Sequence, residues 1–291
     1  MLHRFVLHND EVVEASAKRL AAGQVGLLSG WGVFTTLRVA EGVLFAFERH
    51  WARIGRDAQL LHVPLPEDPE RLRRQLLELV DANGAPDCTL RLAIVRNGGS
   101  MWEGPSVGRA SDVLALTAAS KNWGEGVKLG YQSQARHAQS MFAGTKVLSW
   151  AQNLTWLETA QSRGFDEAIL LNERGQVSEC TSANIFIAAG SQVWTPPLAN
   201  SGCLPGITRE VLLNEVNVPG IRIGEKDITP EELEAADEVF ITSTTRNLLP
   251  VVQVEDRKVG RANRVVGELR AAFAGFLARY VAARKAQPAL P

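Results

Sequence analysis

Stretches of strand length and stretches of helical spacing follow one another without regular alternation, and this order constrains the fold more than any other feature of the sequence. Short apolar stretches bounded by turn residues predict strands at residues 1–8, 11–14, 33–39, 43–46, 88–96, 112–117, 127–134, 167–171, 184–187, 192–194 and 238–242. Apolar residues at helical spacing predict helices at residues 47–61, 71–82, 149–163, 208–215 and 262–285. Because these elements do not form regular βαβ units, we expect a mixed α/β fold of the α+β kind, built around antiparallel sheets.

The length of the chain and one polar stretch predict two domains. A chain of 291 residues, 45% of them hydrophobic, is long enough for two cores. Residues 118–126 (AASKNWGEG) are polar and glycine-bearing, as a linker between domains would be. We therefore predict a small N-terminal domain at residues 1–120, a linker at 121–127 and a larger C-terminal domain at 128–291.

Charge and cysteine content exclude several classes of partner. The 31 basic and 32 acidic residues give a net charge of −1, which favours neither nucleic acid nor an anionic membrane. No apolar run approaches the roughly 20 residues of a membrane helix, and the first residues do not resemble a secretory signal, so we expect a cytoplasmic protein. Three widely spaced cysteines without a C-x-x-C pair predict reduced thiols and no metal site.

Four polar segments, far apart in the sequence, carry candidate chemistry. None contains the glycine patterns of dinucleotide or nucleotide phosphate binding. Each alone has an ordinary reading: a surface lysine, a turn carboxylate, a capped helix or a polar strand end. The segments are Gly144-Thr145-Lys146, the stretch from Val177 to Phe186 (VSECTSANIF), the stretch from Leu204 to Arg209 (LPGITR), and the stretch from Ile241 to Thr245 (ITSTT).

Taken together, the four segments supply what a pyridoxal 5′-phosphate site needs. A lysine can bind the cofactor aldehyde covalently and move a proton. A carboxylate can keep the pyridine nitrogen protonated, so that the ring accepts electrons. A helix start and nearby hydroxyls can hold the phosphate dianion.

In this order and spacing the segments resemble the fold-type IV pyridoxal-phosphate enzymes, over nearly the whole chain. That family includes branched-chain aminotransferases, D-amino-acid aminotransferases, R-selective amine transaminases and 4-amino-4-deoxychorismate lyases. The resemblance implies the two-domain fold of the D-amino-acid aminotransferases, with pyridoxal 5′-phosphate bound between the domains, and a homodimer.

The resemblance also implies roles for individual residues. Lys146 would be the catalytic lysine that carries the cofactor, and Glu179 would contact the pyridine nitrogen. The phosphate contacts would be Ile207 and Thr208 at the helix start, with Ser243 and Thr244 after the late strand. The E-R-H-x-x-R pattern at Glu48–Arg53 would supply a phosphate-binding guanidinium from Arg53, with His50 more structural than catalytic.

One departure from the family leaves a contact open. Many members have a tyrosine shortly after the lysine, which touches the phenolic oxygen of the cofactor. Here the stretch reads Val147-Leu148-Ser149-Trp150, and Trp150 resembles the R-selective transaminases. Which residue contacts that oxygen stays undecided.

The choice of reaction rests on the loop after Arg96. The lyases and D-amino-acid enzymes place an arginine five residues beyond this position, whereas here Met101 is followed by Trp102. An apolar loop suits a hydrophobic side chain better than a dicarboxylate, since an unpaired carboxylate there would be costly. We therefore predict amino transfer between a hydrophobic or branched-chain amino acid and a 2-oxo acid. The alternatives are the aminodeoxychorismate lyase reaction and a catalytically silent binding protein of the same fold. The candidate substrate residues are Thr35, Arg38, Arg91, Met101 and Trp102.

Overall fold

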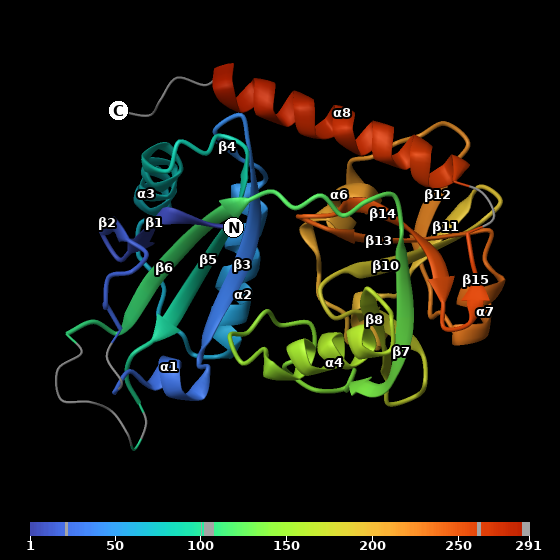
Figure 1. Ribbon diagram of the computed structural model, residues 1–291, viewed down its shortest axis with the longest axis horizontal. Helices are drawn as coiled ribbons and strands as arrows, with labels where there is room; N and C mark the ends of the chain where they lie inside the picture. The colour runs from blue at the N-terminus through green and yellow to red at the C-terminus, as the bar shows by residue number, and fades with distance from the viewer. Residues whose placement is uncertain (21–22, 100, 102–107, 261–262, 287–291) are drawn as a thin grey trace. The chain divides into compact units, whose positions relative to one another are not determined.

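The protein folds into two compact units (Figure 1). The computed structural model describes residues 1–291 except 21–22, 100, 102–107, 261–262 and 287–291. The first unit comprises Met1–Lys121, Lys146–Trp150 and Tyr280–Pro291, and the second comprises Asn122–Thr145 and Ala151–Arg279. The first unit thus takes in two short segments from later in the chain.

The described residues of the first unit form a six-stranded antiparallel sheet. Its strands follow the order β2-β1-β6-β5-β3-β4. The hairpins predicted at residues 1–14 and 33–46 are confirmed, and Glu41 and Gly42 make the second turn with positive φ. The strands are β1 (Leu2–His8), β2 (Glu11–Glu14), β3 (Gly32–Ala40), β4 (Val43–Leu44), β5 (Cys88–Arg96) and β6 (Ser111–Ala119).

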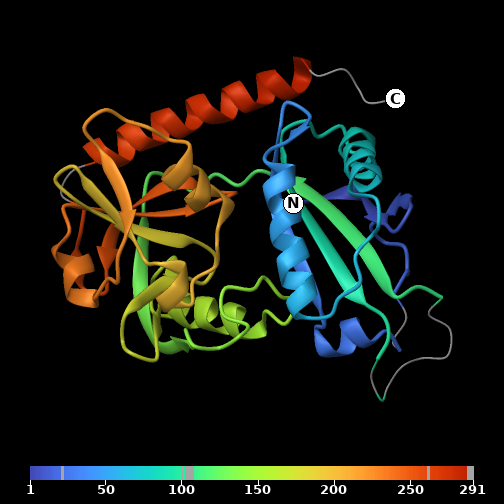
Figure 2. The same ribbon diagram turned by 180° about the vertical axis from the view of Figure 1, so that it is seen from behind.

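Helices α2 (Phe47–Leu60) and α3 (Pro69–Ala82) cover one face of this sheet (Figure 2). Their apolar residues, such as Ile54 and Leu76, share a core with Leu37 of β3. The short helix α1 (Val25–Ser29) precedes β3. Because side chains alternate along a strand, Phe34, Thr36 and Arg38 lie on the opposite face of the sheet from Leu37.

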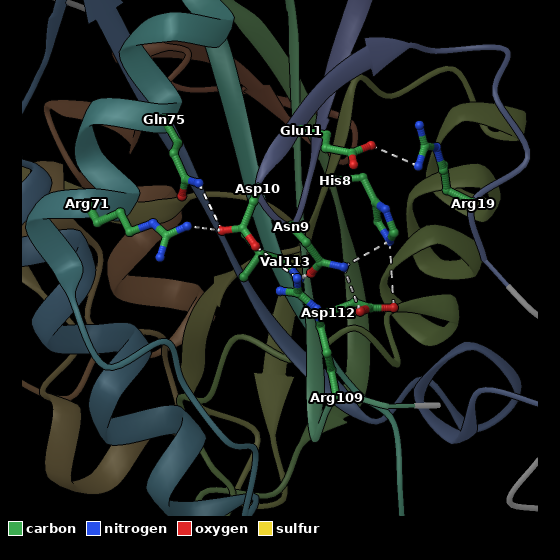
Figure 3. A network of polar contacts seen from close by, with 10 residues as sticks. All are labelled: His8, Asn9, Asp10, Glu11, Arg19, Arg71, Gln75, Arg109, Asp112 and Val113. Carbon is green, nitrogen blue, oxygen red and sulfur yellow. Dashed lines mark hydrogen bonds and ion pairs between the residues drawn. The ribbon is translucent and has the colours of Figure 1, made fainter. Parts of the chain in front are cut away.

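A polar network ties the β1–β2 turn to α3 and to the start of β6 (Figure 3). Asp10 accepts hydrogen bonds from Arg71 and Arg109 at 2.9 Å and from Gln75 at 3.1 Å. These contacts lower the pKa of Asp10, with the Arg109 hydrogen bond as the largest cause. Asn9 binds Asp112 of β6 at 2.9 Å. The network fixes the chain at the start of β6.

The described residues of the second unit form a nine-stranded sheet of mixed direction. The order is β12-β11-β10-β13-β14-β7-β8-β9, with β15 paired to β14. The strands are β7 (Val127–Arg136), β8 (Glu167–Asn172), β9 (Val177–Cys180), β10 (Asn184–Ala189), β11 (Gln192–Thr195), β12 (Arg222–Glu225), β13 (Glu238–Ser243), β14 (Asn247–Val254) and β15 (Arg257–Lys258). The pairs β7–β8, β7–β14 and β11–β12 are parallel. The expectation of antiparallel sheets is therefore confirmed for the first unit and wrong for the second.

Helix α4 (Ala151–Ser162) explains one of the parallel pairs, because parallel strands need a crossover and α4 connects β7 to β8. It packs through Trp156 and Ala160 against Leu170 of β8. The remaining helices are α5 (Leu198–Ser201), α6 (Ile207–Asn214), α7 (Pro230–Ala235) and α8 (Arg264–Ala286).

Helix α8 is held at both ends by carboxylates. The buried Glu238 accepts hydrogen bonds from the N–H groups of Val265 and Val266 at 2.9 and 2.8 Å, which satisfies donors that a helix start leaves open. The last turn belongs to the first unit, where Tyr280 donates to Glu48 at 2.7 Å and packs edge-on against Phe45.

The cysteines agree with the predicted reduced state. All three are buried and free, and burial is the largest cause raising the pKa of Cys88 and Cys203 to about 11. Within the described part of the chain, no helix is long and apolar enough to cross a membrane.

Candidate active site

Lys146 sits in a short segment that adds itself to the edge of β3. Val147 forms a β-bridge with Val33, the Phe34 N–H donates to the Lys146 carbonyl at 3.1 Å, and the Leu148 N–H donates to the Gly32 carbonyl at 2.9 Å. The Lys146 N–H donates to Asp57 of α2 at 3.0 Å. Both sides of the lysine backbone are thereby fixed. Asp57, buried and 89 residues away in the sequence, was not predicted from the sequence.

Aromatic rings surround the amine of Lys146. Its Nζ lies 4.5 Å from the centre of the Phe34 ring and 5.7 Å from that of Trp150. The two rings meet edge to face at 5.9 Å and 77°. Phe34 and Trp150 therefore give the Lys146 amine an aromatic surrounding.

Arg53, Thr35 and His50 form a buried group on the helix side of the first sheet. Arg53 donates to the Thr35 hydroxyl at 2.8 Å, and this hydroxyl lies 2.7 Å from His50 Nδ1. Burial, reinforced by Arg53 and Lys146, holds the pKa of His50 well below its usual value, so the ring is neutral. Thr35 is fully buried, which favours a role in holding Arg53 over contact with substrate.

Arg91 lies on the other face of the same sheet, stacked on Phe34. Its Cζ is 3.9 Å from the centre of the Phe34 ring and 5.9 Å from that of Trp150. Burial lowers the pKa of Arg91. The described residues offer its guanidinium no hydrogen-bond acceptor, so its edge N–H groups are available for an anion. Arg38 is on the same face. In the register of β3 and β5, Arg38 lies opposite Thr89 and Thr36 lies opposite Arg91.

Glu179 lies within β9 of the second unit, not in a turn between strands as the sequence pattern suggested. Its side chain is buried and held at both oxygens. Arg136 Nε donates to Oε1 at 2.9 Å, and the Leu204 N–H donates to Oε2 at 3.0 Å. Each carboxylate oxygen has a second lone pair, so Glu179 can still accept a hydrogen bond from a ligand.

Asn184 completes the S-E-x-x-x-x-N-x-F pattern by holding the same loop. Its Nδ2 donates to the Leu204 carbonyl at 2.8 Å. Leu204 therefore connects the two motif residues, since its N–H binds Glu179 and its carbonyl binds Asn184. Gly206 lies so close to Asn184 that an added Cβ would approach its Oδ1 to well under 3.0 Å. The motif is thus a local clamp on the residues before α6.

The predicted phosphate residues of the second unit lie near this clamp. Ile207 and Thr208 are buried in the first turn of α6, and Gly206 at the N-cap provides no side-chain cap. The open N–H groups of such a helix start attract anions. Asn184 opposes Thr242 across the β10–β13 ladder, and Ser243 and Thr244 follow it. The buried Thr242 hydroxyl has no hydrogen-bond partner among the described residues.

A second buried ion pair, between Glu167 and Arg246, holds the middle of the Val177–Phe186 motif. No sequence motif indicated it. Glu167 accepts from Arg246 at 3.0 Å and from Ser182 at 2.7 Å. Arg246 stacks on Trp123 at 4.0 Å. Ser182 precedes Asn184 by two residues, so this pair anchors the middle of the motif.

The structure brings the predicted residues together in two groups. Glu179, Ile207, Thr208, Ser243 and Thr244 belong to the second unit, and Lys146, Arg53, Thr35, Arg38 and Arg91 to the first. Gly144, two residues before Lys146, packs in the second unit against the Cys203 carbonyl, to which an added Cβ would lie 2.7 Å away. Met101 is 87% exposed, and Trp102 lies outside the described residues. In the part of the chain that the structure describes, no cluster of histidine, cysteine or acidic residues could hold a metal ion.

Comparisons with known proteins identify the family of the chain. Residues 32–254 match the family described as amino-transferase class IV. The chain is 31% identical to a D-alanine aminotransferase of Bacillus licheniformis, over 88% of this chain and 90% of the relative. It is 27% identical to a branched-chain-amino-acid aminotransferase of Pseudomonas aeruginosa, over 81% and 80%. A crystal structure of a branched-chain aminotransferase from Thermoproteus uzoniensis with norvaline superimposes with a TM-score of 0.85, at 28% identity and 95% coverage of both chains.

Proposed function

Because the chain belongs to the class IV aminotransferase family, we propose that it transfers an amino group between a hydrophobic, branched-chain-like amino acid and a 2-oxo acid with bound pyridoxal 5′-phosphate. The observation that carries this proposal is the fixed setting of Lys146 and Glu179. The backbone of Lys146 is held by two long-range hydrogen bonds, and the carboxylate of Glu179 by two more, so that the lysine is anchored at its main chain and the acid at its reacting group.

The residues present fit the cofactor. The phosphate dianion would be held by Arg53, by the start of α6 at Ile207 and Thr208, and by hydroxyls such as Ser243 and Thr244. The unpartnered Thr242 hydroxyl, buried beside them, indicates a polar site that the chain alone does not satisfy. Glu179 would face the pyridine nitrogen.

When bound, pyridoxal 5′-phosphate withdraws electrons from the bonds at the amino-bearing carbon of the substrate. Lys146 would hold the cofactor covalently through Nζ; once released from it, the amine would take the proton from the substrate α-carbon and deliver it to the carbon of the cofactor that carried the aldehyde. Glu179 would keep a proton on the pyridine nitrogen.

For the substrate, Arg91 is the favoured carboxylate partner. Its guanidinium stacks on an aromatic ring and leaves its edge open, the arrangement that binds a carboxylate through two parallel hydrogen bonds. Phe34 and Trp150 beside it provide apolar contact for an aliphatic side chain. Arg38 on the same face is a second candidate, and Met101 and Trp102 remain predictions.

The test begins with the cofactor. Borohydride reduction of the purified protein after incubation with pyridoxal 5′-phosphate should fix the label to Lys146, as read by peptide mapping. A panel of leucine, valine and D-alanine with 2-oxoglutarate or pyruvate should then give amino transfer. A label on another residue would refute the assignment of Lys146. Rapid release of p-aminobenzoate from aminodeoxychorismate without amino transfer would identify a lyase instead.

The proposed enzyme is a cytoplasmic homodimer. The first unit exposes apolar side chains on α1, with Leu27 at 48% and Leu28 at 63% relative exposure, which supports self-association. Light scattering of the purified protein should give twice the 31.7 kDa chain mass. A mass of one chain at micromolar concentration would argue against the dimer.

A further inference from the structure

Arg136 is the only described side chain that forms an ion pair with Glu179, and no motif of the sequence pointed to it. It is the last residue of β7, and the side chains of this pair are 17% and 9% exposed. Resting on the function proposed above, we propose that Arg136 is a positioning residue that fixes the Glu179 carboxylate and places the shared proton on the ring nitrogen of the cofactor.

The geometry gives Arg136 little freedom. Its Nε donates to Glu179, and its Nη1 donates to the Ala135 carbonyl at 3.2 Å and to Asn153 Oδ1 at 3.3 Å. Asn153 in α4 is fixed in turn, because its Nδ2 donates to the Thr181 carbonyl at 2.7 Å. The guanidinium also stacks on Trp156 at 5.5 Å. The pair therefore joins the end of β7, the helix α4 and the motif around Glu179.

Orienting the Glu179 carboxylate does not by itself require a positively charged residue at position 136. The Leu204 N–H already orients Oε2, and a neutral donor could orient Oε1 as well. A guanidinium in direct contact with the carboxylate adds an electrostatic effect, because its positive charge attracts the ionised carboxylate at hydrogen-bond distance. Arg136 thereby favours a protonated ring facing an ionised carboxylate over two neutral groups.

This assignment separates Arg136 from an ordinary structural ion pair. A structural pair would affect folding and leave the ring proton unchanged. If the pair sets the position of the proton, its removal changes the ring-nitrogen signal of the bound cofactor even when folding is unaffected. The chain offers a matched control in Arg163, which pairs with Glu255 at 2.5 Å in the same unit and is 44% exposed.

The experiment uses holoenzyme loaded with pyridoxal 5′-phosphate labelled with ¹⁵N in the ring, for the wild type, Arg136→Gln, Arg136→Lys and Arg163→Gln. The ¹⁵N chemical shift reports whether the ring nitrogen is protonated. We expect the wild type and Arg163→Gln to give the protonated shift, Arg136→Gln to move toward the unprotonated value, and Arg136→Lys to recover most of the wild-type shift because it keeps the charge. Turnover of Arg136→Gln should fall by at least about tenfold, the effect of one charge-assisted hydrogen bond.

Asn153→Ala guards against a variant that fails to fold. It removes a partner of Nη1 while leaving the charge in place, so a smaller shift in the same direction is expected. A wild-type shift in both Arg136→Gln and Asn153→Ala, with Glu179→Gln changed, would overturn the inference and leave the proposed function standing. Failure of the cofactor to attach to Lys146 in the wild type would instead refute the proposed function.

Discussion

The close approach of Gly206 to Asn184 allows a sharp test of the clamp on the α6 start. A Cβ at residue 206 would meet Asn184 Oδ1 at well under 3.0 Å and its Cγ at 3.2 Å. The φ of Gly206 is −69°, which any residue adopts, so Gly206→Ala adds a clash without backbone strain. The buried Asn184 amide must move by about an ångström to reach an allowed contact, and its 2.8 Å bond to the Leu204 carbonyl is lost.

The cost in stability comes from the buried group that loses its hydrogen-bond partner. The Leu204 carbonyl keeps its hydrogen bond from the Gly206 N–H, but the buried Asn184 amide loses its acceptor. A buried donor without a partner costs about 1–3 kcal/mol, so we take about 1–2 kcal/mol for this partial loss. Alanine is also a poorer N-cap than glycine, by about 0.5 kcal/mol. Gly206→Ala should therefore lower the free energy of unfolding by about 2 kcal/mol.

The assay is a double-mutant cycle on the apoprotein, measured by urea and thermal unfolding. Asn184→Ala removes the atoms that the new methyl group would hit; the next nearest atom, Arg209 Cβ, is at 3.8 Å. Gly206→Ala should then cost only about 0.5 kcal/mol, a coupling of about 1–2 kcal/mol between neighbours. The exposed helical Gly267, with nothing within 4 Å of a Cβ, is the control, and its change to alanine should raise stability by up to about 1 kcal/mol. Additive effects of Gly206→Ala and Asn184→Ala would refute the clash argument.

Three further changes test the site itself. The pKa of His50 is depressed in the folded protein, so below about pH 6.5 the unfolded chain binds more protons than the folded one. The free energy of unfolding should therefore fall on acidification, by up to about 1.4 kcal/mol per pH unit from this group. His50→Gln should flatten that slope in unfolding measured across pH. Arg53→Ala should raise the dissociation constant for pyridoxal 5′-phosphate by roughly ten- to a hundredfold, the loss of a contact of about 1.5–3 kcal/mol, and an unchanged titration would place the phosphate elsewhere. Glu179→Gln should retain the cofactor but reduce kcat at least about a hundredfold, or about 3 kcal/mol of barrier, and near-normal turnover would remove Glu179 from the assignment.

The sequence predicted elements well where local pattern and environment agree. Cys88–Arg96 was predicted with its observed bounds, because alternating apolar residues face the core covered by α2 and α3. The strand Asn247–Val254 was not predicted. It carries Pro250, which argues against an interior strand, yet β14 lies between β13 and β7. Long-range pairing there overrides the local signal.

The candidate site shows the same division. Motif residues such as Lys146 and Glu179 could be selected from the sequence, because their chemical types and spacing are informative. Their partners Asp57 and Arg136 could not, since each lies 43 or more residues from the group it holds and neither belongs to a local pattern. The contacts that fix a reacting group come from tertiary structure, and a single sequence does not display them.

The bridge between Val147 and Val33 also governs how the chain can be cut. A fragment that ends at Lys121 would keep most of the first sheet but lack residues 146–148, which cover the start of β3. The Phe34 N–H and the Gly32 carbonyl would then face solvent along an apolar edge, the kind of edge that recruits strands from other molecules. Such a fragment should aggregate, and a synthetic peptide spanning the lysine segment should suppress that aggregation by refilling the edge. The lysine segment therefore protects this edge of the first sheet from pairing with strands of other molecules.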